Sequence, residues 1–143
     1  MTLRYLLDTN TISDPARPVP HPGILERLRR HDGEIALAAP VWHELWFGCE
    51  RLPPSQKRTR IEDYLQSLRA LPVLAYDAAA AAWHATERAR LAAAGREPSF
   101  VDGQIAAIAR SHDLTVVTSN LRHFEPFAGL QIEDWRGAPS LIP

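Results

Sequence analysis

The fold is decided by residues 3–10, LRYLLDTN, near the start of the chain. A short run rich in Leu and Tyr that stops at polar turn residues is typical of a buried strand. In open α/β sheets ligands bind beyond the carboxyl ends of the strands, and Asp8, Thr9 and Asn10 occupy that place. The stretch therefore predicts a functional site at the end of a strand, although Asp8 taken alone fits equally well as the N-cap of a following helix.

Length and composition indicate one domain over residues 1–143. With 143 residues, of which 45% are hydrophobic, the chain can bury one sizeable core but not two. No stretch approaches the roughly 20 apolar residues of a membrane span, and no apolar signal segment precedes Asp8, so we expect a cytoplasmic protein. Cys49 is the only cysteine, which excludes an intrachain disulfide and a cysteine-based metal site and predicts a buried, inert thiol.

Apolar patterns along the rest of the chain alternate between strand-like and helix-like segments. Further strands are expected at 34–38, 72–76, 114–118 and 130–132, and helices at 24–30, 40–48, 55–71, 78–94 and 100–109. This alternation predicts a parallel sheet with helices on both faces and right-handed crossovers. The helix at 78–94 starts with five alanines, a composition that suits close packing in the core or against a second subunit.

Four polar positions fall where they could meet at one edge of this sheet. Asp8 and Asn120 follow strands, and Glu44 lies in a helix after a strand. Asp102 lies in the first turn of a helix, because residues 99–102 have the S-x-x-D form of a capping box. Converging carboxylates are stable in the ionised form only with a cation, and Mg²⁺ or Mn²⁺ at such a site suits phosphodiester hydrolysis. Three unrelated surface acids would have the same spacing, so spacing alone leaves both interpretations open.

Four blocks of sequence resemble the signatures of PIN-domain ribonucleases, and especially the VapC/FitB-type toxins of prokaryotic toxin–antitoxin pairs. The blocks are LLDTN at 6–10, EL with Gly48 at 44–48, DGQIAA at 102–107 and TSNLRHF at 118–124. They come in the family's order and spacing, and the resemblance extends from residue 3 to about residue 133. It implies a PIN-like three-layer α/β fold, with a five-stranded parallel sheet in the order 3-2-1-4-5 and the acids above its C-terminal edge.

The resemblance also implies roles for the residues of these blocks. Asp8, Glu44 and Asp102 match the family's metal-binding acids and, with Asn120, form the expected catalytic set. Asp8 and Asp102 are the expected ligands of Mg²⁺ or Mn²⁺. Asn120 stands where the family often has Asp, which leaves the cluster one charge short for a second metal ion. Gly103 is a second departure, because Ala is usual there.

Residues beside these blocks complete the expected site. Residues expected to support the site or bind substrate are Thr9, Asn10, Thr118, Arg96, Arg122 and His123. Thr118 matches a hydroxyl that supports Asn120, and Arg96 and Arg122 flank the third and fourth blocks, where they suit phosphate contact. The net charge of −1 argues against a uniformly basic nucleic-acid binder, so RNA contact must depend on such local groups. Most of the other histidines are expected to be surface or capping residues.

The favoured function is a metal-dependent endoribonuclease that acts as the toxin of a toxin–antitoxin module. Its expected partners are RNA, a cognate antitoxin and a second copy of the chain. Trp42, Trp46 and Phe47 share a helix with Glu44, and in the family this helix and the next form a groove for an antitoxin segment. The alternative is a non-catalytic PIN-fold module that binds RNA or an antitoxin-like partner, with Asn120 as the first step of decay. The three intact acids favour the enzyme.

Overall fold

The strands of the chain form a single parallel sheet, as a computed structural model that describes residues 2–137 shows. They are β1 (Tyr5–Leu7), β2 (Ile35–Ala38), β3 (Val73–Leu74), β4 (Thr115–Val117) and β5 (Ile132–Glu133). The strand order is β3-β2-β1-β4-β5 and every pairing is parallel. The predicted fold class and strand order are therefore confirmed.

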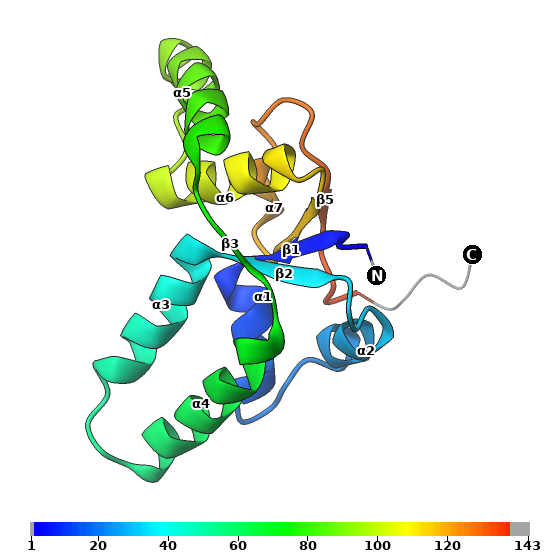
Figure 1. Cartoon of the computed structure of the whole chain (residues 1–143), viewed down its shortest axis with the longest axis vertical. Helices are drawn as coiled ribbons and strands as arrows, with labels where there is room; N and C mark the ends of the chain where they lie inside the picture. The colour runs from blue at the N-terminus through cyan, green and yellow to red at the C-terminus, as the bar shows by residue number, and fades with distance from the viewer. Residues whose placement is uncertain (1, 138–143) are drawn as a thin grey trace.

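Helices cover both faces of this sheet. They are α1 (Thr9–Ser13), α2 (Pro22–Arg30), α3 (Ala39–Glu50), α4 (Gln56–Ser67), α5 (Ala78–Ala93), α6 (Phe100–Ser111) and α7 (Leu121–Phe124), with 3-10 turns η1 (Asp14–Ala16) and η2 (Leu68–Ala70). In Figure 1, α1 to α4 lie below β1 and β2, whereas α5 and α6 lie above them. Within the described residues, no helix is long and apolar enough to cross a membrane.

The sheet lies in the centre of the core because its strands are apolar on both faces. β1 and β2 are buried at every position, which is the pattern of parallel strands with helices on each side. Above them, α6 contributes a run of small and branched side chains from Ile105 to Ala109 that are all buried. The strand end that carries Asp8 is therefore held by the best-packed part of the molecule.

Several elements differ from the sequence-based expectation. β3 covers only Val73–Leu74 of the strand expected at 72–76, and the helix expected at 55–71 divides into α4 and η2. Helix α7 was not predicted, because four residues are too few to show a helical period. β5 begins at Ile132 rather than at residue 130, since Gly129 has a left-handed φ of 71° that extends the preceding turn. The expected tail with Pro139 and Pro143 lies outside the described residues.

The last described residues pack against the start of the chain. The Trp135 ring lies 5.1 Å from Tyr5 in β1 and stacks on His31 at 5.5 Å. A Cβ on Gly23 would lie 2.7 Å from the Trp135 carbonyl oxygen, so only glycine lets this segment cross α2 so closely. Arg136 Nη2 donates to the Ser119 carbonyl at 3.3 Å. The segment thus contacts both β1 and the loop after β4.

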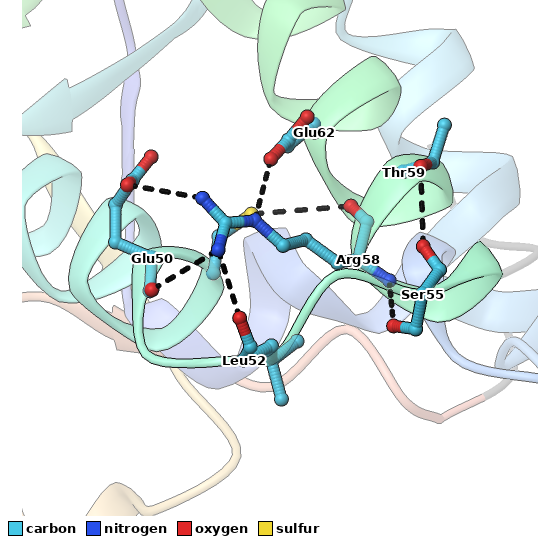
Figure 2. Close-up of polar contacts among 7 residues, drawn as sticks. Glu50, Leu52, Ser55, Arg58, Thr59 and Glu62 are labelled. Carbon is cyan, nitrogen blue, oxygen red and sulfur yellow. Dashed lines mark hydrogen bonds and ion pairs between the residues drawn. The ribbon is translucent and has the colours of Figure 1, made fainter.

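One arginine connects the two ends of the α3–α4 turn (Figure 2). Arg58 in α4 donates through Nε to Glu62 Oε1 at 2.7 Å, through Nη1 to the Leu52 carbonyl at 2.8 Å, and through Nη2 to Glu50 Oε2 at 3.2 Å. Ser55 accepts from the Arg58 backbone N–H at 3.1 Å and N-caps α4. The rigid fork of the guanidinium therefore fixes how α3 and α4 lie beside each other.

Candidate active site

Asp8 is the centre of the candidate site and has two structural partners. Its backbone N–H donates to the Val117 carbonyl at 2.8 Å, which continues the β1–β4 ladder. Its Oδ1 accepts from the Thr9 backbone N–H at 2.8 Å and caps α1, while its Oδ2 accepts from the Thr118 hydroxyl at 2.9 Å. The side chain is almost buried, at 8% exposure. Asp8 is thus both the cap of α1 and a carboxylate at the sheet edge.

Thr118 lies directly after β4, in a position to reach Asp8 across the strand pair. Leu7 and Val117 are partners in the β1–β4 register, so the residues after them emerge side by side. The Thr118 hydroxyl also accepts from the Asn120 backbone N–H at 3.0 Å. The family resemblance implied only that Thr118 supports Asn120, and the hydrogen bond from Thr118 to Asp8 was not predicted. The signal that could have found this bond is the pairing of the two strand ends.

Asp102 lies in the first turn of α6, as the capping pattern predicts. Ser99 Oγ accepts from the Asp102 backbone N–H at 3.2 Å, which confirms the predicted cap. Asp102 Oδ2 lies 3.4 Å from Nδ1 of His123 in α7. The negative charge of Asp102 acts on Asp8. Asp102 therefore contacts His123 and lies close enough to Asp8 for its charge to affect that carboxyl.

The electrostatics of this pair suit a bound cation. Burial raises the pKa of the Asp8 carboxyl, and the charge of Asp102 raises it further. Hydrogen bonds from Thr118 and Thr9 and the proximity of His123 oppose the rise. A divalent cation beside both carboxylates would remove the repulsion and replace lost hydration.

The donor set fits a hard ion held by few protein ligands. Over residues 2–137, no three side chains of His, Cys, Asp or Glu gather closely enough to hold a metal ion. Mg²⁺ does not need such a cage, because it is usually bound by one or two carboxylates, several waters and substrate phosphates. Asp8 and Asp102 would be the two carboxylates of such a site.

Glu44 lies apart from the carboxylate pair. Its side chain is 46% exposed, and its Oε1 lies 3.6 Å from Nδ1 of His43. With Thr9 it lines a groove of about 550 Å³ between α1, α3 and α4, so it borders the neighbourhood of Asp8 from the groove side. Its role as the third acid stays a prediction.

The expected phosphate-binding residues surround a second hollow, on the Asp102 side. This hollow of about 330 Å³ is lined by Asp102, His123, Arg96 and Arg122, among others. The two arginines, from the loop before α6 and from α7, provide positive charge beside an acid that could hold a metal ion. Asn10 lies exposed in the first turn of α1, and its side-chain role stays a prediction.

The groove on the other side has an apolar floor and a basic rim. Leu45, Leu52, Ile61 and Leu65 contribute apolar side chains, and Arg17, Arg51, Lys57 and Arg60 contribute cations. Trp42 and Trp46 pack against the core in a T-shaped pair at 5.8 Å, whereas Phe47 is exposed. Of these three aromatic side chains of α3, two therefore pack against the core and one lies on the surface.

Most histidines outside the blocks lie on the surface or at a helix cap, as predicted. His21 caps α2 by accepting from the Gly23 N–H at 3.2 Å. His84 is the exception, because it is 3% exposed and lies on the side of α5 that packs against Gly103 of α6. An imidazole with a hydrogen-bond partner can be buried as neutral, which sequence spacing does not reveal. Cys49 is buried and burial raises its pKa, which confirms the predicted buried thiol.

Comparison with known proteins identifies the family of this chain. Residues 5–129 match the PIN domain, and the chain belongs to the PIN domain family. Within it, the chain is 36% identical to the tRNA(fMet)-specific endonuclease VapC of Shigella flexneri over 134 residues, which cover 93% of this chain and 98% of that protein. It is 36% identical to Toxin FitB of Neisseria gonorrhoeae over 126 residues, 83% of this chain and 89% of the relative. The crystal structure of DNA-bound VapBC from Salmonella typhimurium has a chain with TM-score 0.82 and 35% identity, covering 93% of this chain and 98% of that one.

The substitution Asp8→Asn should raise the melting temperature of the metal-free protein near neutral pH. The pKa of Asp8 is raised in the folded state, so protonation of its carboxyl stabilises the folded protein. This stabilisation is complete below the unfolded pKa, near 3.8, and is lost as the pH rises through the folded pKa. The neutral amide avoids this loss. In thermal unfolding with EDTA, the advantage of the variant should therefore grow as the pH rises above 3.8 and become constant once the pH has passed the folded pKa of Asp8.

The matched control is Asp63→Asn, which removes an exposed carboxylate from α4 and should leave the melting temperature unchanged. A melting temperature of Asp8→Asn below that of the unmodified protein at every pH would contradict this expectation. It would mean that the charged cap of α1 outweighs the cost of burying the carboxylate.

Proposed function

We propose that this protein is a metal-dependent endoribonuclease and the toxin of a toxin–antitoxin module. The observation that carries the proposal is the buried Asp8 carboxylate beside the charge of Asp102, at the carboxyl edge of a parallel sheet. Relatives that match almost the whole chain are named as RNA-cleaving enzymes, including Ribonuclease VapC2 of Haemophilus influenzae. Membership of the PIN family and this carboxylate pair support the same chemistry.

In this proposal, Asp8 and Asp102 hold the metal ion and the residues around them fix its ligands. The bound ion, Mg²⁺ or Mn²⁺, would supply Lewis-acid stabilisation of the phosphate and a water of lowered pKa. Thr9 and Thr118 orient the two oxygens of Asp8, each of which keeps a further lone pair. His123 lies beside Asp102 and orients its carboxylate. The protein therefore contributes a pre-oriented pair of ligands.

The remaining predicted residues act on the RNA and on the edges of the site. Arg96 and Arg122 bind backbone phosphates in the hollow beside Asp102. Glu44 lines the groove on the other side and is the third acid of the proposed site, and Asn10 supports the site from the first turn of α1. The roles of Glu44 and Asn10 follow from the match of these residues to the family's sequence blocks.

The purified protein should cleave RNA only with added Mg²⁺ or Mn²⁺, and Asp102→Asn should lower the rate on the order of 10²-fold or more, because it removes one of two metal ligands. Initiator tRNA is the first substrate to test, since the Shigella relative is named for tRNA(fMet), and an elongator tRNA gives the comparison. Cleavage is measured by mapping new 5′ ends, with and without EDTA.

The control for this experiment is Asp113→Asn, at the opposite edge of the sheet. Asp113 has a φ of 56°, a left-handed conformation that Asn tolerates well. Cleavage that persists in EDTA would reject the metal mechanism. Binding of RNA or antitoxin without any cleavage, in the presence of either metal ion, would instead support the non-catalytic module.

The substitution Asn120→Asp should tighten Mn²⁺ binding in the absence of RNA. Asn120 follows β4 and precedes α7, and its side chain accepts no capping hydrogen bond from the described residues of that helix. Its amide oxygen is therefore available to the site, and a carboxylate there would add a charge that favours the cation. Titration calorimetry of both proteins with Mn²⁺ measures the change. Equal affinities would show that the side chain of residue 120 does not face the metal.

We also propose that the cognate antitoxin occupies the groove between α3 and α4, and that two copies of the chain pair through α5. The basic rim and apolar floor of the groove suit an acidic, amphipathic segment. Several similar structures are complexes with an antitoxin, such as VapBC from Salmonella typhimurium. Helix α5 presents a smooth row of exposed alanines to a second copy.

Light scattering should give twice the mass of one chain for the isolated protein. Ala85→Arg places a long cation in the alanine row of α5 and should shift the mass to that of one chain. Gln66→Arg, at the exposed end of α4, is the control and should keep the doubled mass. A single-chain mass for the unmodified protein, both free and with antitoxin, would reject the pairing.

A further inference from the structure

His84 of α5 lies against the backbone of α6 at Gly103. A Cβ built on Gly103 would overlap His84 Nε2, and it would lie 2.7 Å from Cδ2 and 2.8 Å from Cε1 of the same ring. Contacts this short do not occur between real atoms, so the imidazole fills the volume that any larger residue at 103 would need. Position 103 must therefore be glycine as long as the His84 ring occupies this place.

The imidazole is held in this place by its other neighbours. Its Nδ1 makes a 2.8 Å hydrogen bond with the Tyr76 hydroxyl, and the Phe100 ring lies 5.0 Å away. Burial, together with the positive charge of Arg88, lowers the pKa of His84. One ring nitrogen is hydrogen-bonded to Tyr76 and the other lies against the backbone of α6 at Gly103. The contribution of His84 to α6 is therefore the volume of its ring.

The contact lies one residue from a proposed metal ligand. Asp102 and Gly103 are consecutive in the first turn of α6, where the Gly103 N–H donates to the Ser99 carbonyl at 3.0 Å. The distance between α5 and α6 at this turn is limited by the His84 ring. A shift of the backbone at Gly103 would move Asp102 relative to Asp8.

We propose that His84 and Gly103 form a steric pair that positions Asp102 for metal binding. His84 is then a positioning residue for the nuclease site, and the proposal rests on the proposed function because it takes Asp102 as a ligand. The pair also gives a physical reason for Gly103: the imidazole occupies the space that a methyl group at this position would need. A larger residue at 103 would therefore require a smaller one at 84.

The test is a cycle of four proteins: unmodified, Gly103→Ala, His84→Ala and the double variant. Each is measured for the Mn²⁺ dissociation constant, for kcat on RNA and for melting temperature. Gly103→Ala should weaken Mn²⁺ binding about tenfold and lower kcat on the order of 10²-fold, as expected when a reacting group is misplaced by about 1 Å. The double variant should recover both to within a fewfold of the unmodified protein, because the new methyl group enters the space that the imidazole leaves.

The melting temperature provides an independent test, because the direction of its change should differ between the two backgrounds. Glycine to alanine inside a helix ordinarily stabilises a protein, since alanine has the higher helix propensity. Here Gly103→Ala alone should lower the melting temperature, whereas the same change in the His84→Ala background should raise it. If Gly103→Ala does not fold, His84→Ala and the double variant still test the proposal: His84→Ala should bind Mn²⁺ several-fold more weakly, and adding Gly103→Ala to it should restore part of that affinity.

A matched control separates positioning from stability. Ile108→Val removes one methyl group from a fully buried site in the same helix, so it should lower the melting temperature without changing Mn²⁺ affinity or kcat. A lowered melting temperature for Gly103→Ala with unchanged Mn²⁺ affinity and kcat would overturn the positioning role. Absence of recovery in the double variant would overturn the steric pair. Failure of the proposed function is distinguishable, because it would appear in the unmodified protein as a lack of Mn²⁺-dependent cleavage.

Discussion

The hydrogen bond between the Thr118 hydroxyl and Asp8 Oδ2 is the interaction on which the candidate site depends. It joins the ends of β1 and β4, the two strands at the centre of the sheet, at 2.9 Å. Asp8 can remain buried there because both of its oxygens accept hydrogen bonds, which offsets part of the cost of removing a carboxylate from water. The same burial raises its pKa and makes a cation favourable beside it. The Asp8 side chain thus contributes both to the structure of the sheet edge and to the electrostatics of the candidate site.

The site lies between two openings of different character. The groove with Thr9 and Glu44 opens beside Asp8, and its floor is apolar. The hollow with Arg96, Arg122 and His123 opens beside Asp102, and its lining is basic. In the proposed function, the groove binds a protein segment and the hollow binds a phosphate backbone, so each ligand meets the lining that suits it. Arg58 matters to this arrangement because its hydrogen bonds fix the turn that joins the two helices of the groove.

Most of the fold could be predicted because its signals are local. Apolar runs marked β1, β2 and β4, and the capping pattern at Ser99 correctly located the start of α6. α7 escaped prediction because it is a single turn. In the site, strand order alone brings Asp8 and Thr118 together, whereas the place of Asp102 depends on how closely α6 approaches. The contact of His84 with Gly103, which limits that approach, is made between two helices and has no periodic signal in the sequence.

The crossing of the C-terminal segment over α2 has a consequence for the nascent chain. Trp135 packs on Tyr5, Arg136 bonds to the Ser119 carbonyl, and the Thr118 N–H donates to the Glu133 carbonyl at 2.9 Å. The loop that carries Thr118 and Asn120 is therefore supported by residues that follow it in the sequence. A nascent chain that has been synthesised only through Asn120 contains Asp8 and Asp102 but lacks these supports. The acidic edge of this protein is thus completed only after residues 133–136 have left the ribosome, well after both of its acids.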